Sequence, residues 1–420
     1  MRILFVGLVI PYPPLNGHRL RTWAILRALA QDGHQVTLLS FADPGEEVAE
    51  GNPLIELCQS IELMAPPRPN GGRGSAYVGR AQSLLSPLPH GVWRFRSAGF
   101  KKRIEGALAR ECFDAVLCDG VYNMVNLPES LAVPVLLNKD DVAHVLVRRH
   151  LELERNAARR FYAWLEYQKL RRWEEQAGQR CTAIWACSEC DQKQLQALCP
   201  GVPIVVVPNV VDTDHYVPAR EEDPLIILYQ GGMDWHPNRD AVEFFVSQIL
   251  PKLRRLVPGA KFVVAGRNPS EEFRRRFAGI PGVEFTGTLP DMRAEMAKAA
   301  VCVVPLRVAS GTRLKILEAA AMAKPVVSTG VGAEGLEFVN RREIVLADEP
   351  QTFAREVADL LTDASRRQAL GQAARRRVEQ QYSFPVLRTA VRHALAELGT
   401  SRWRSGKQPQ PILSADEGPR

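Results

Sequence analysis

Residues 305–336, PLRVASGTRLKILEAAAMAKPVVSTGVGAEGL, carry the strongest fold signal in the chain. They follow an apolar run over residues 300–305 that predicts a buried parallel strand. A loop of small residues comes next, and apolar residues at helical spacing then predict a helix over residues 313–322. Pro325 ends that helix, and residues 326–329 begin another strand. Strand, loop, helix and strand in this order form the repeating unit of a parallel α/β sheet.

The loop at residues 309–312 would present backbone N–H groups at a helix N-terminus, which is an anion-binding arrangement. Arg313 and Lys315 lie in the first turn, where each cation opposes the helix dipole by about 0.3–1 kcal/mol. A phosphate above them would explain both, and Glu318 on the same face would accept hydrogen bonds from sugar or ribose hydroxyls. In the alternative, Lys315 and Glu318 form a surface pair and Arg313 is solvated. These residues alone leave both interpretations open.

The segment also resembles the donor-nucleotide site of family 4 glycosyltransferases, in the branch that reads S-G-T-R-x-K-x-x-E. The resemblance implies the GT-B fold, an α/β architecture of two facing, doubly wound Rossmann-like domains with a cleft between them. Glu318 matches the second of two family glutamates, which contacts the donor ribose. Ser310 stands where the first, sugar-contacting glutamate usually stands, and Gly311 and Thr312 complete the loop.

Composition limits the class of protein. At 420 residues the chain can form two domains with sizeable cores. No apolar stretch approaches the roughly 18 residues of a membrane span, and residues 1–13 read as a first strand and not as a signal peptide. We therefore expect a cytoplasmic protein. The net charge of +7 comes largely from arginines spaced as solvated helix faces, so peripheral contact with an anionic inner membrane face is more plausible than nucleic-acid binding.

Strand and helix signals alternate twice along the chain, on either side of a polar stretch with two prolines at residues 208–223. The pattern predicts an acceptor-side domain over residues 1–212 and a nucleotide-sugar-binding domain over residues 213–384. In the first domain, a β run is expected over residues 3–9 and a long charged helix over residues 152–177. A helix over residues 385–400 is expected to pack back on the first domain. Residues 401–420 have no period and are expected to be disordered.

Glycine-bearing loops supply the other donor-side candidates. Residues 1–40 resemble the start of the family, whose first loop faces the donor phosphates, and Gly17 permits close backbone approach there. His18 stands where many members have a second glycine, and it either donates to a phosphate or faces solvent. In the second domain the family's Arg and Lys after a glycine pair are absent. The resemblance adds these donor-side candidates, for which ordinary turns are the alternative: Gly232, Gly266, Arg267, Thr288 and Leu289.

Residues 136–154, LLNKDDVAHVLVRRHLELE, are the acceptor-side candidate because they follow a strand. The resemblance places Asp140 at a family histidine, Asp141 at an asparagine and His144 at a second histidine. Asp140 would orient an acceptor hydroxyl or take its proton, and an exposed helix cap is the alternative. A further segment, residues 87–108, combines Trp93, Phe95 and Phe100 with basic residues. It suits a membrane surface or lipid-linked acceptor, although an ordinary domain helix is the more economical interpretation.

The resulting hypothesis is a glycosyltransferase that moves a sugar from a nucleotide diphosphate sugar to an acceptor hydroxyl, with retention, in glycan or glycoconjugate biosynthesis. Asp140, Arg313 and Lys315 would be the catalytic residues, with the two cations stabilising the departing diphosphate. The acceptor would be a glycan, a lipid-linked glycan or a small molecule. We expect no cofactor and no metal, since Cys187 and Cys190 lack a second pair and the aspartates do not cluster. The alternatives are a nucleotide-sugar 2-epimerase of the same fold and a non-catalytic nucleotide- or glycan-binding protein.

Overall fold

The computed structural model describes residues 1–67, 83–219, 222–267 and 269–398. The chain forms two compact units, which we call the N-terminal domain (Met1–Pro208 with the chain from Leu387) and the C-terminal domain (Asn209–Val386). The boundary between the two domains, after Pro208, lies four residues before the boundary expected after residue 212. The expected tail at residues 401–420 falls outside the described residues.

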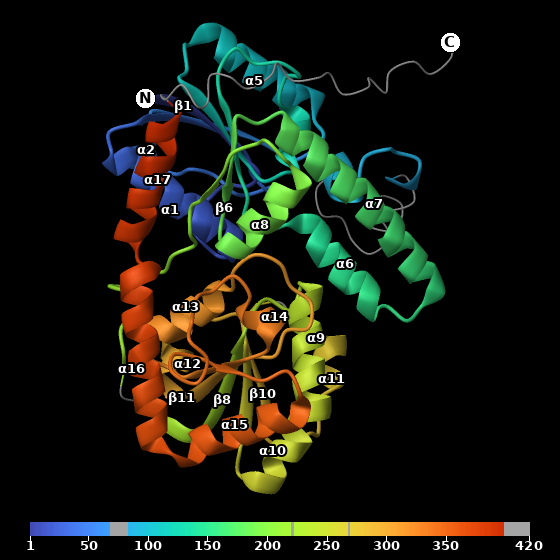
Figure 1. The fold of residues 1–420 in the computed structure, drawn as a ribbon, viewed down its shortest axis with the longest axis vertical. Coiled ribbons are helices and arrows are strands. Elements are labelled where there is room, and N and C mark those ends of the chain that lie inside the picture. The colour runs from blue at the N-terminus through green and yellow to red at the C-terminus, as the bar shows by residue number, and fades with distance from the viewer. Residues whose placement is uncertain (68–82, 220–221, 268, 399–420) are drawn as a thin grey trace. The chain divides into compact units, whose positions relative to one another are not determined.

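The N-terminal domain is built on a parallel sheet with the strand order β3-β2-β1-β4-β5-β6-β7 (Figure 1). Its central strands are continuous apolar runs, which is typical of strands buried on both faces. In β1, for example, Ile3, Leu4, Phe5 and Val6 are all fully buried. The strands are β1 (Arg2–Gly7), β2 (Gln35–Phe41), β3 (Ser60–Met64), β4 (Ala115–Asp119), β5 (Val135–Asn138), β6 (Ala183–Ala186) and β7 (Ile204–Val206).

Helices lie between consecutive strands, as parallel pairing requires. They are α1 (Gly17–Gln31), α2 (Leu54–Leu57), α4 (His90–Phe95), α5 (Ala98–Arg110), η1 (Asn123–Asn126), α6 (Ala143–Leu153), α7 (Ala157–Gln179) and α8 (Glu189–Leu198). The last helix, α17 (Phe384–Glu397), returns the chain to this domain. Arg388 and Arg392 of α17 both bond to the buried carboxylate of Asp32 at the end of α1, at 2.6 and 2.7 Å. These ion pairs fix the C-terminal helix against α1.

The C-terminal domain repeats the design with the strand order β10-β9-β8-β11-β12-β13, again all parallel. Its strands are β8 (Asp223–Gln230), β9 (Lys261–Ala265), β10 (Val283–Gly287), β11 (Ala299–Val304), β12 (Val326–Ser328) and β13 (Val345–Leu346). Its helices are α9 (His236–Phe244), the π-helical turn η2 (Phe245–Ile249), α10 (Leu250–Leu256), α11 (Glu271–Arg275), α12 (Arg293–Lys298), α13 (Leu314–Ala321), α14 (Gly330–Ala333), α15 (Pro350–Thr362) and α16 (Ala364–Gln381).

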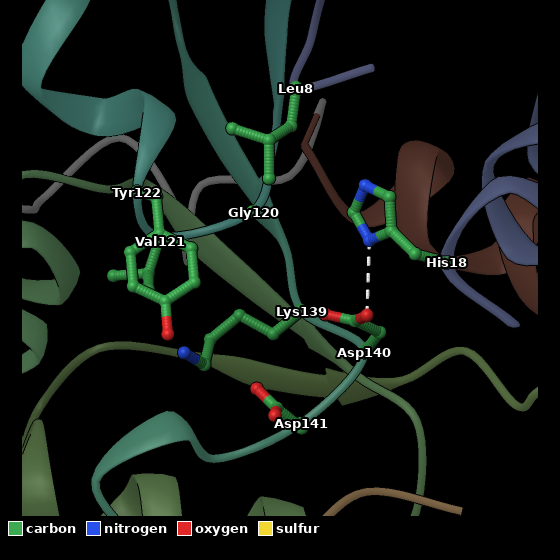
Figure 2. Close-up of a pocket in the computed structure, with 8 residues that line it drawn as sticks. All are labelled: Leu8, His18, Gly120, Val121, Tyr122, Lys139, Asp140 and Asp141. Atoms are coloured by element: carbon green, nitrogen blue, oxygen red, sulfur yellow. Dashed lines mark hydrogen bonds and ion pairs between the residues drawn. The ribbon is translucent and has the colours of Figure 1, made fainter. Parts of the chain in front are cut away.

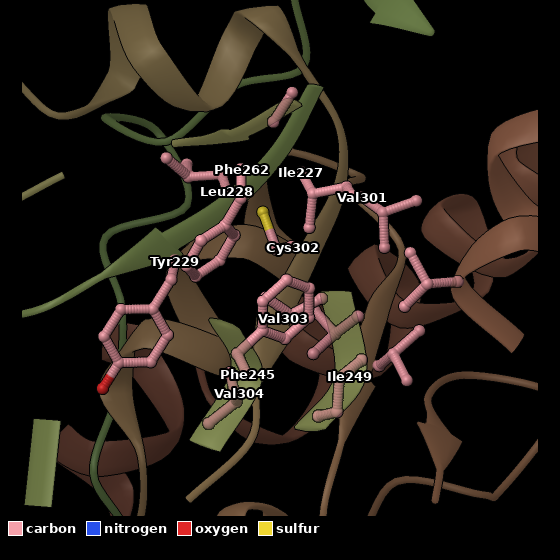
Figure 3. Close-up of a cluster of buried hydrophobic side chains, with 14 of the residues drawn as sticks. Ile227, Leu228, Tyr229, Phe245, Ile249, Phe262, Val301, Cys302, Val303 and Val304 are labelled. Carbon is pink, nitrogen blue, oxygen red and sulfur yellow. The ribbon is translucent and has the colours of Figure 1, made fainter. Parts of the chain in front are cut away.

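The C-terminal domain has its own hydrophobic core, and Figure 3 shows part of that core. Phe245 and Phe262 are fully buried and stack with their ring centroids 4.2 Å apart. Val301 and Val303 of β11 belong to the same cluster. Residues 299–321 thus supply a central strand, β11, and the helix α13 after it.

In each sheet there is one point where the strand order reverses direction. It lies between β1 and β4 in the N-terminal domain and between β8 and β11 in the C-terminal domain. Loops that follow the two strands at such a point diverge to opposite faces of the sheet and leave a crevice at its carboxyl edge. These two edges are therefore where ligand sites are expected.

One prediction about a segment is wrong. The long helix expected over residues 152–177 is interrupted at residues 154–156, which separate α6 from α7. In the aromatic segment at residues 87–108, Phe100 is fully buried, and its ring lies 4.2 Å from that of Phe41. The more economical interpretation, an ordinary domain helix, is correct for that residue. Among the described residues no helix has the length and apolarity to cross a bilayer.

Candidate functional site

The N-terminal domain contains a cavity of about 210 Å³ at its switch point (Figure 2). Loops after β1, β4 and β5 and the first turn of α1 enclose it. Its lining residues are Leu8, His18, Gly120, Val121, Tyr122, Lys139, Asp140 and Asp141. Two of the three acceptor-side candidates, Asp140 and Asp141, are therefore brought to one cavity.

His18 lies between two carboxylates in this cavity. Its Nδ1 is 3.0 Å from Oδ2 of Asp140, the bond drawn in Figure 2, and its Nε2 is 3.0 Å from Oδ2 of Asp119. Asp119 is fully buried and also accepts hydrogen bonds from Thr22 and Asn138, at 2.9 and 2.7 Å. These bonds fix Asp119, which in turn holds the imidazole ring facing Asp140.

The charges of this group follow from its contacts. Burial is the largest influence on the pKa of His18 and lowers it, but Asp119 and Asp140 together outweigh burial, and the pKa lies well above its usual value. Burial likewise raises the pKa of Asp140, but the charge and hydrogen bond of His18 outweigh it, and the pKa lies well below its usual value. At neutral pH the pair is an imidazolium and a carboxylate. Asp140 is thus an acceptor of hydrogen bonds and a weak base.

Behind the cavity, Glu174 of α7 gathers four donors. It accepts from Lys139 Nζ at 2.5 Å, from the backbone N–H groups of Ala143 and His144 at 3.1 and 2.8 Å, and from His144 Nδ1 at 2.7 Å. Burial raises the pKa of Glu174, but Lys139 and His144 outweigh it and lower the pKa to about 2. Glu174 therefore caps α6 from a neighbouring helix.

This arrangement corrects two expectations about the acceptor side. Asp140 is not a helix cap, because α6 begins three residues later and Glu174 takes its free N–H groups. His144 is not among the residues that line the cavity, because its ring is bonded to Glu174. Asp141 lines the cavity, and burial, followed by the charge of Asp140, raises its pKa.

The donor-side candidates follow four adjacent strands of the C-terminal sheet. Gly232 follows β8, Gly266 and Arg267 follow β9, Thr288 and Leu289 follow β10, and residues 310–318 follow β11. Because carboxyl ends of parallel strands meet at one edge, the topology brings all of them to the same edge of this domain. In the other domain Gly17 is exposed as the first residue of α1, beside His18.

Gly266 has a structural reason to be glycine. Its φ is +149°, and a Cβ there would lie 2.1 Å from the carbonyl oxygen of Gly231. The loops after β8 and β9 can approach this closely only because residue 266 has no side chain. Arg267 of the same loop lies near Asp234, with Nε 3.8 Å from Oδ2.

Lys315 is half-buried and held in a defined position on α13. Its Nζ donates to Asn238 Oδ1 at 2.9 Å and to Tyr229 Oη at 3.2 Å, and it lies 4.4 Å from the centroid of the Tyr229 ring. Burial, followed by the nearby charge of Arg313, lowers the pKa of Lys315 to about 7. Burial therefore disfavours the ammonium form of Lys315 without abolishing it at neutral pH. A bound anion would stabilise that form.

Glu318, one turn along α13, is also held. It accepts from Gln230 Nε2 at 2.5 Å and from Tyr216 Oη at 3.3 Å, and burial raises its pKa. Lys315 and Glu318 thus bond to different residues, and they do not form the surface pair of the alternative interpretation.

Arg313 is placed differently from the expectation. It is the cap residue of α13 and not part of its first turn, and its guanidinium folds back on its own loop. It donates to the carbonyl oxygens of Ser310, at 2.6 Å, and of Gly311, and only 4% of the residue is exposed. Thr312 of this loop accepts a hydrogen bond from Asn209 at 2.7 Å. Arg313 therefore shapes the donor loop instead of pointing away from it.

Several residues of these sites were missed from the sequence. Asp119 and Glu174 lie far along the chain from the residues they hold, and neither belongs to a motif. A partial signal existed for Tyr229, Gln230 and Asn238, since they flank the glycine pair after β8. Within the described residues no group of His, Cys, Asp and Glu has the arrangement of a metal site. Cys187 is buried and donates to the backbone oxygen of Asp140 at 3.1 Å.

Comparison with known proteins gives a match in each domain. Residues 15–215 match the model described as Glycosyltransferase Family 4, and residues 224–363 match the model described as Glycosyl transferases group 1. Glycogen synthase of Mycobacterium tuberculosis is 26% identical over 227 residues, 51% of this chain and 52% of that enzyme. The chain thus spans about half the length of this curated relative.

Solved structures share the fold over nearly the whole chain. Sucrose-phosphate synthase from Thermosynechococcus elongatus superimposes with a TM-score of 0.73 at 18% identity, covering 95% of this chain and 99% of that one. Anabaena HepE in complex with UDP-glucose superimposes with a TM-score of 0.65 at 13% identity, covering 95% and 100%. These likenesses confirm the expected architecture of two doubly wound domains. With a glycosyltransferase family model matched in each of its two domains, the chain belongs to the glycosyltransferases of the GT-B fold.

Proposed function

We propose that the protein transfers a sugar from a nucleotide diphosphate sugar to an acceptor hydroxyl, with retention of configuration at the anomeric carbon. The observation that carries the proposal is the pair Lys315 and Glu318. Both side chains are half-buried on α13, at the edge where four strands of the C-terminal domain end. A half-buried amine and a half-buried carboxylate one turn apart match the diphosphate and the ribose of one nucleotide.

On the donor side, Lys315 supplies the charge. Its ammonium would lie against the diphosphate and stabilise the negative charge that grows on this leaving group as the glycosidic bond breaks. Arg313 contributes indirectly, because it holds the carbonyl groups of residues 310 and 311 and so leaves the loop's N–H groups available. Glu318 would accept the ribose hydroxyls, since a carboxylate has more acceptor sites than its two present donors occupy.

On the acceptor side, Asp140 would orient the attacking hydroxyl. Its side chain is 35% exposed, lines the cavity and is ionised, so it can accept the hydroxyl proton in a hydrogen bond. Because its pKa is depressed, we assign it an orienting role and not that of a strong base. His18 acts through Asp140 by fixing the direction of the carboxylate.

The relatives support the donor class. HepE is solved with UDP-glucose, and glycogen synthase is by name a sugar-polymerising enzyme. We extend only the class, a nucleotide diphosphate sugar, to this chain. The acceptor is proposed to be a glycan, a lipid-linked glycan or a small molecule. The proposal also includes peripheral contact with an anionic membrane. Phe100 takes no part in that contact, because its side chain is buried.

A screen of nucleotide sugars by thermal unfolding tests the donor half. A ligand that binds only the folded state raises the melting temperature. At a ligand concentration one hundred times Kd, it adds about 2.7 kcal/mol to the free energy of unfolding. We expect at least one nucleotide sugar, and its nucleoside diphosphate, to raise the melting temperature while the nucleoside alone does so weakly. No shift with any nucleotide would remove the proposal.

One observation keeps the epimerase as a second candidate. The cavity brings together His18, Asp140 and Asp141, with Asp119 behind His18, which is more acid and base chemistry than the sequence indicated. Incubation with the donor and no acceptor separates the two activities. An epimerase produces a second nucleotide sugar, whereas a glycosyltransferase releases nucleoside diphosphate. NMR of the products distinguishes them.

A further inference from the structure

The connection between α6 and α7 is an exposed part of the described N-terminal domain. The two helices pack side by side (Figure 1) and are joined by residues 154–156. We call the end of this pair, residues 152–164, the hairpin tip. Most of its side chains are exposed, and Phe161 and Trp164 are among them.

Large apolar side chains are exposed at the hairpin tip. Leu153 is 42% exposed, Phe161 63% and Trp164 46%. The rings of Phe161 and Trp164 stack on each other, with centroids 5.9 Å apart and an interplanar angle of 28°. Two stacked aromatic rings left in water are unusual in a chain that otherwise buries residues such as Phe100, and contiguous exposed apolar groups mark an interaction surface.

A second apolar segment lies along the same helix. Lys169 of α7 donates to the carbonyl oxygen of Ser83 at 2.9 Å, which fixes that part of the chain beside α7. The next two residues, Leu84 and Leu85, are 45% and 92% exposed. The exposed apolar surface around α7 is therefore larger than the hairpin tip alone.

The charge around these apolar groups is positive. Over residues 148–165, five arginines stand against two glutamates. Arg155, Arg159 and Arg160 are exposed at the hairpin tip itself. Aromatic and leucine side chains beside arginines suit the boundary of an anionic bilayer, where rings lie at headgroup depth and guanidinium groups contact lipid phosphates.

The same charge argues against a second copy of the chain as the partner. A symmetric dimer through the hairpin tip would place each arginine-rich surface opposite its own copy. Like charges at such short range are destabilising. An anionic partner does not have this difficulty.

We propose that the hairpin tip docks on an anionic lipid bilayer, with Leu153, Phe161 and Trp164 entering the interface and the neighbouring arginines contacting lipid phosphates. The location has a functional consequence. α6 begins two residues after Asp141 of the cavity and ends at the tip, and its 11 residues span about 16 Å. A bilayer at the tip would therefore lie roughly one helix length from the cavity, within reach of the headgroup of a lipid-linked acceptor; this last step rests on the proposed function.

Co-sedimentation of the full chain with vesicles tests the docking. We expect binding to phosphatidylcholine vesicles that contain phosphatidylglycerol, weaker binding as salt rises, and at least tenfold weaker partition to pure phosphatidylcholine. Phe161→Ala/Trp164→Ala and, separately, Arg159→Glu/Arg160→Glu should each lower partition at least tenfold. All four positions are exposed, so the melting temperature should be unchanged.

Matched controls come from the C-terminal domain. Arg274→Glu/Arg275→Glu makes the same change of charge on exposed α11, and Leu256→Ala removes an apolar side chain that is 50% exposed. Both should sediment like the unmodified protein. Equal sedimentation of the tip variants and the controls, equal binding to both kinds of vesicle, or no binding to either would overturn the proposal. Donor cleavage in solution is measured on the same samples, so a failure of the enzymatic proposal is seen independently of lipid binding.

Discussion

At the residue scale, the proposed function depends on a few side chains whose charge is set by burial. Lys315 is the clearest, because its pKa of about 7 places its titration within the working range. By contrast, His18 and Asp140 each have one form at neutral pH, His18 as a cation and Asp140 as an anion. Lys315 thus gives donor binding a pH dependence that can be measured.

We predict that affinity for the nucleotide sugar falls as pH rises above about 7. The free amine is then neutral, and the diphosphate must draw a proton to restore the ammonium, at a cost of up to tenfold in affinity per pH unit. A nucleotide sugar has no terminal phosphate that titrates in this range, so calorimetry with it reports the protein. Lys315→Met should bind weakly with little pH dependence, whereas Lys261→Met, at an exposed lysine, should behave as the unmodified protein. If the affinity of Lys315→Met for the nucleotide sugar had the same pH dependence, a group other than Lys315 would be responsible for it.

Asp140→Asn is predicted to bind donor normally and to transfer ten- to hundredfold more slowly. The asparagine keeps the shape but loses a charged hydrogen bond, worth about 1.5–3 kcal/mol. His144→Gln is the comparison, since that ring is bonded to Glu174 and not among the lining residues. It should retain transfer if its melting temperature shows an intact fold. Normal turnover by Asp140→Asn would leave the cavity without an assigned acceptor contact.

At the element scale, α6 depends on a residue of α7. Glu174 takes two of its free N–H groups and neutralises buried Lys139, so a single carboxylate supports the loop that carries Asp140 and Asp141. Neither helix would hold the cavity wall in place alone.

Glu174→Gln is therefore predicted to lower the free energy of unfolding by about 3–5 kcal/mol, because it leaves a buried ammonium unpaired. The pKa of Glu174 is lower in the folded protein, about 2, than the ordinary 4.5, so the stability it contributes is complete above pH 4.5 and is lost as pH falls toward 2. The free energies of unfolding of the two proteins, measured with urea, should differ above pH 4.5 and become equal as the pH approaches 2. Glu175→Gln, one residue along and exposed, should change stability by less than about 0.5 kcal/mol. A constant difference at all pH values would contradict the role of the charge.

The elements also show where sequence reading succeeds. Strands β1 and β11 are uninterrupted apolar runs flanked by glycine or proline, so their positions were predicted within a residue or two. The interruption between α6 and α7 was missed because residues 154–156 contain neither Gly nor Pro. The structure shows a local cap there, in which the side chain of Asn156 accepts from the N–H of Arg159. The two-residue strand β13 is too short to leave a periodic signal.

At the scale of the whole molecule, the two-domain architecture was predictable because strand-helix alternation occurs twice. The sites were only partly predictable. Lys315 and Glu318 lie three residues apart in one motif, whereas His18 and Asp140 are 122 residues apart and meet only through the sheet order. The direction of the Arg313 side chain also depends on the folded loop and could not be read from its position in the motif.

The central claim is that the chain cleaves a nucleotide diphosphate sugar held by Glu318 and Lys315. The most direct measurement is the rate of nucleoside diphosphate release from a panel of nucleotide sugars by the unmodified protein, Glu318→Gln and Glu284→Gln, the last an exposed control on β10. We predict release by the unmodified protein and by Glu284→Gln, and a ten- to hundredfold slower release by Glu318→Gln with unchanged melting temperature, because one strong hydrogen-bond acceptor is lost. Release at equal rates by all three proteins, or by none with any donor, would contradict the account.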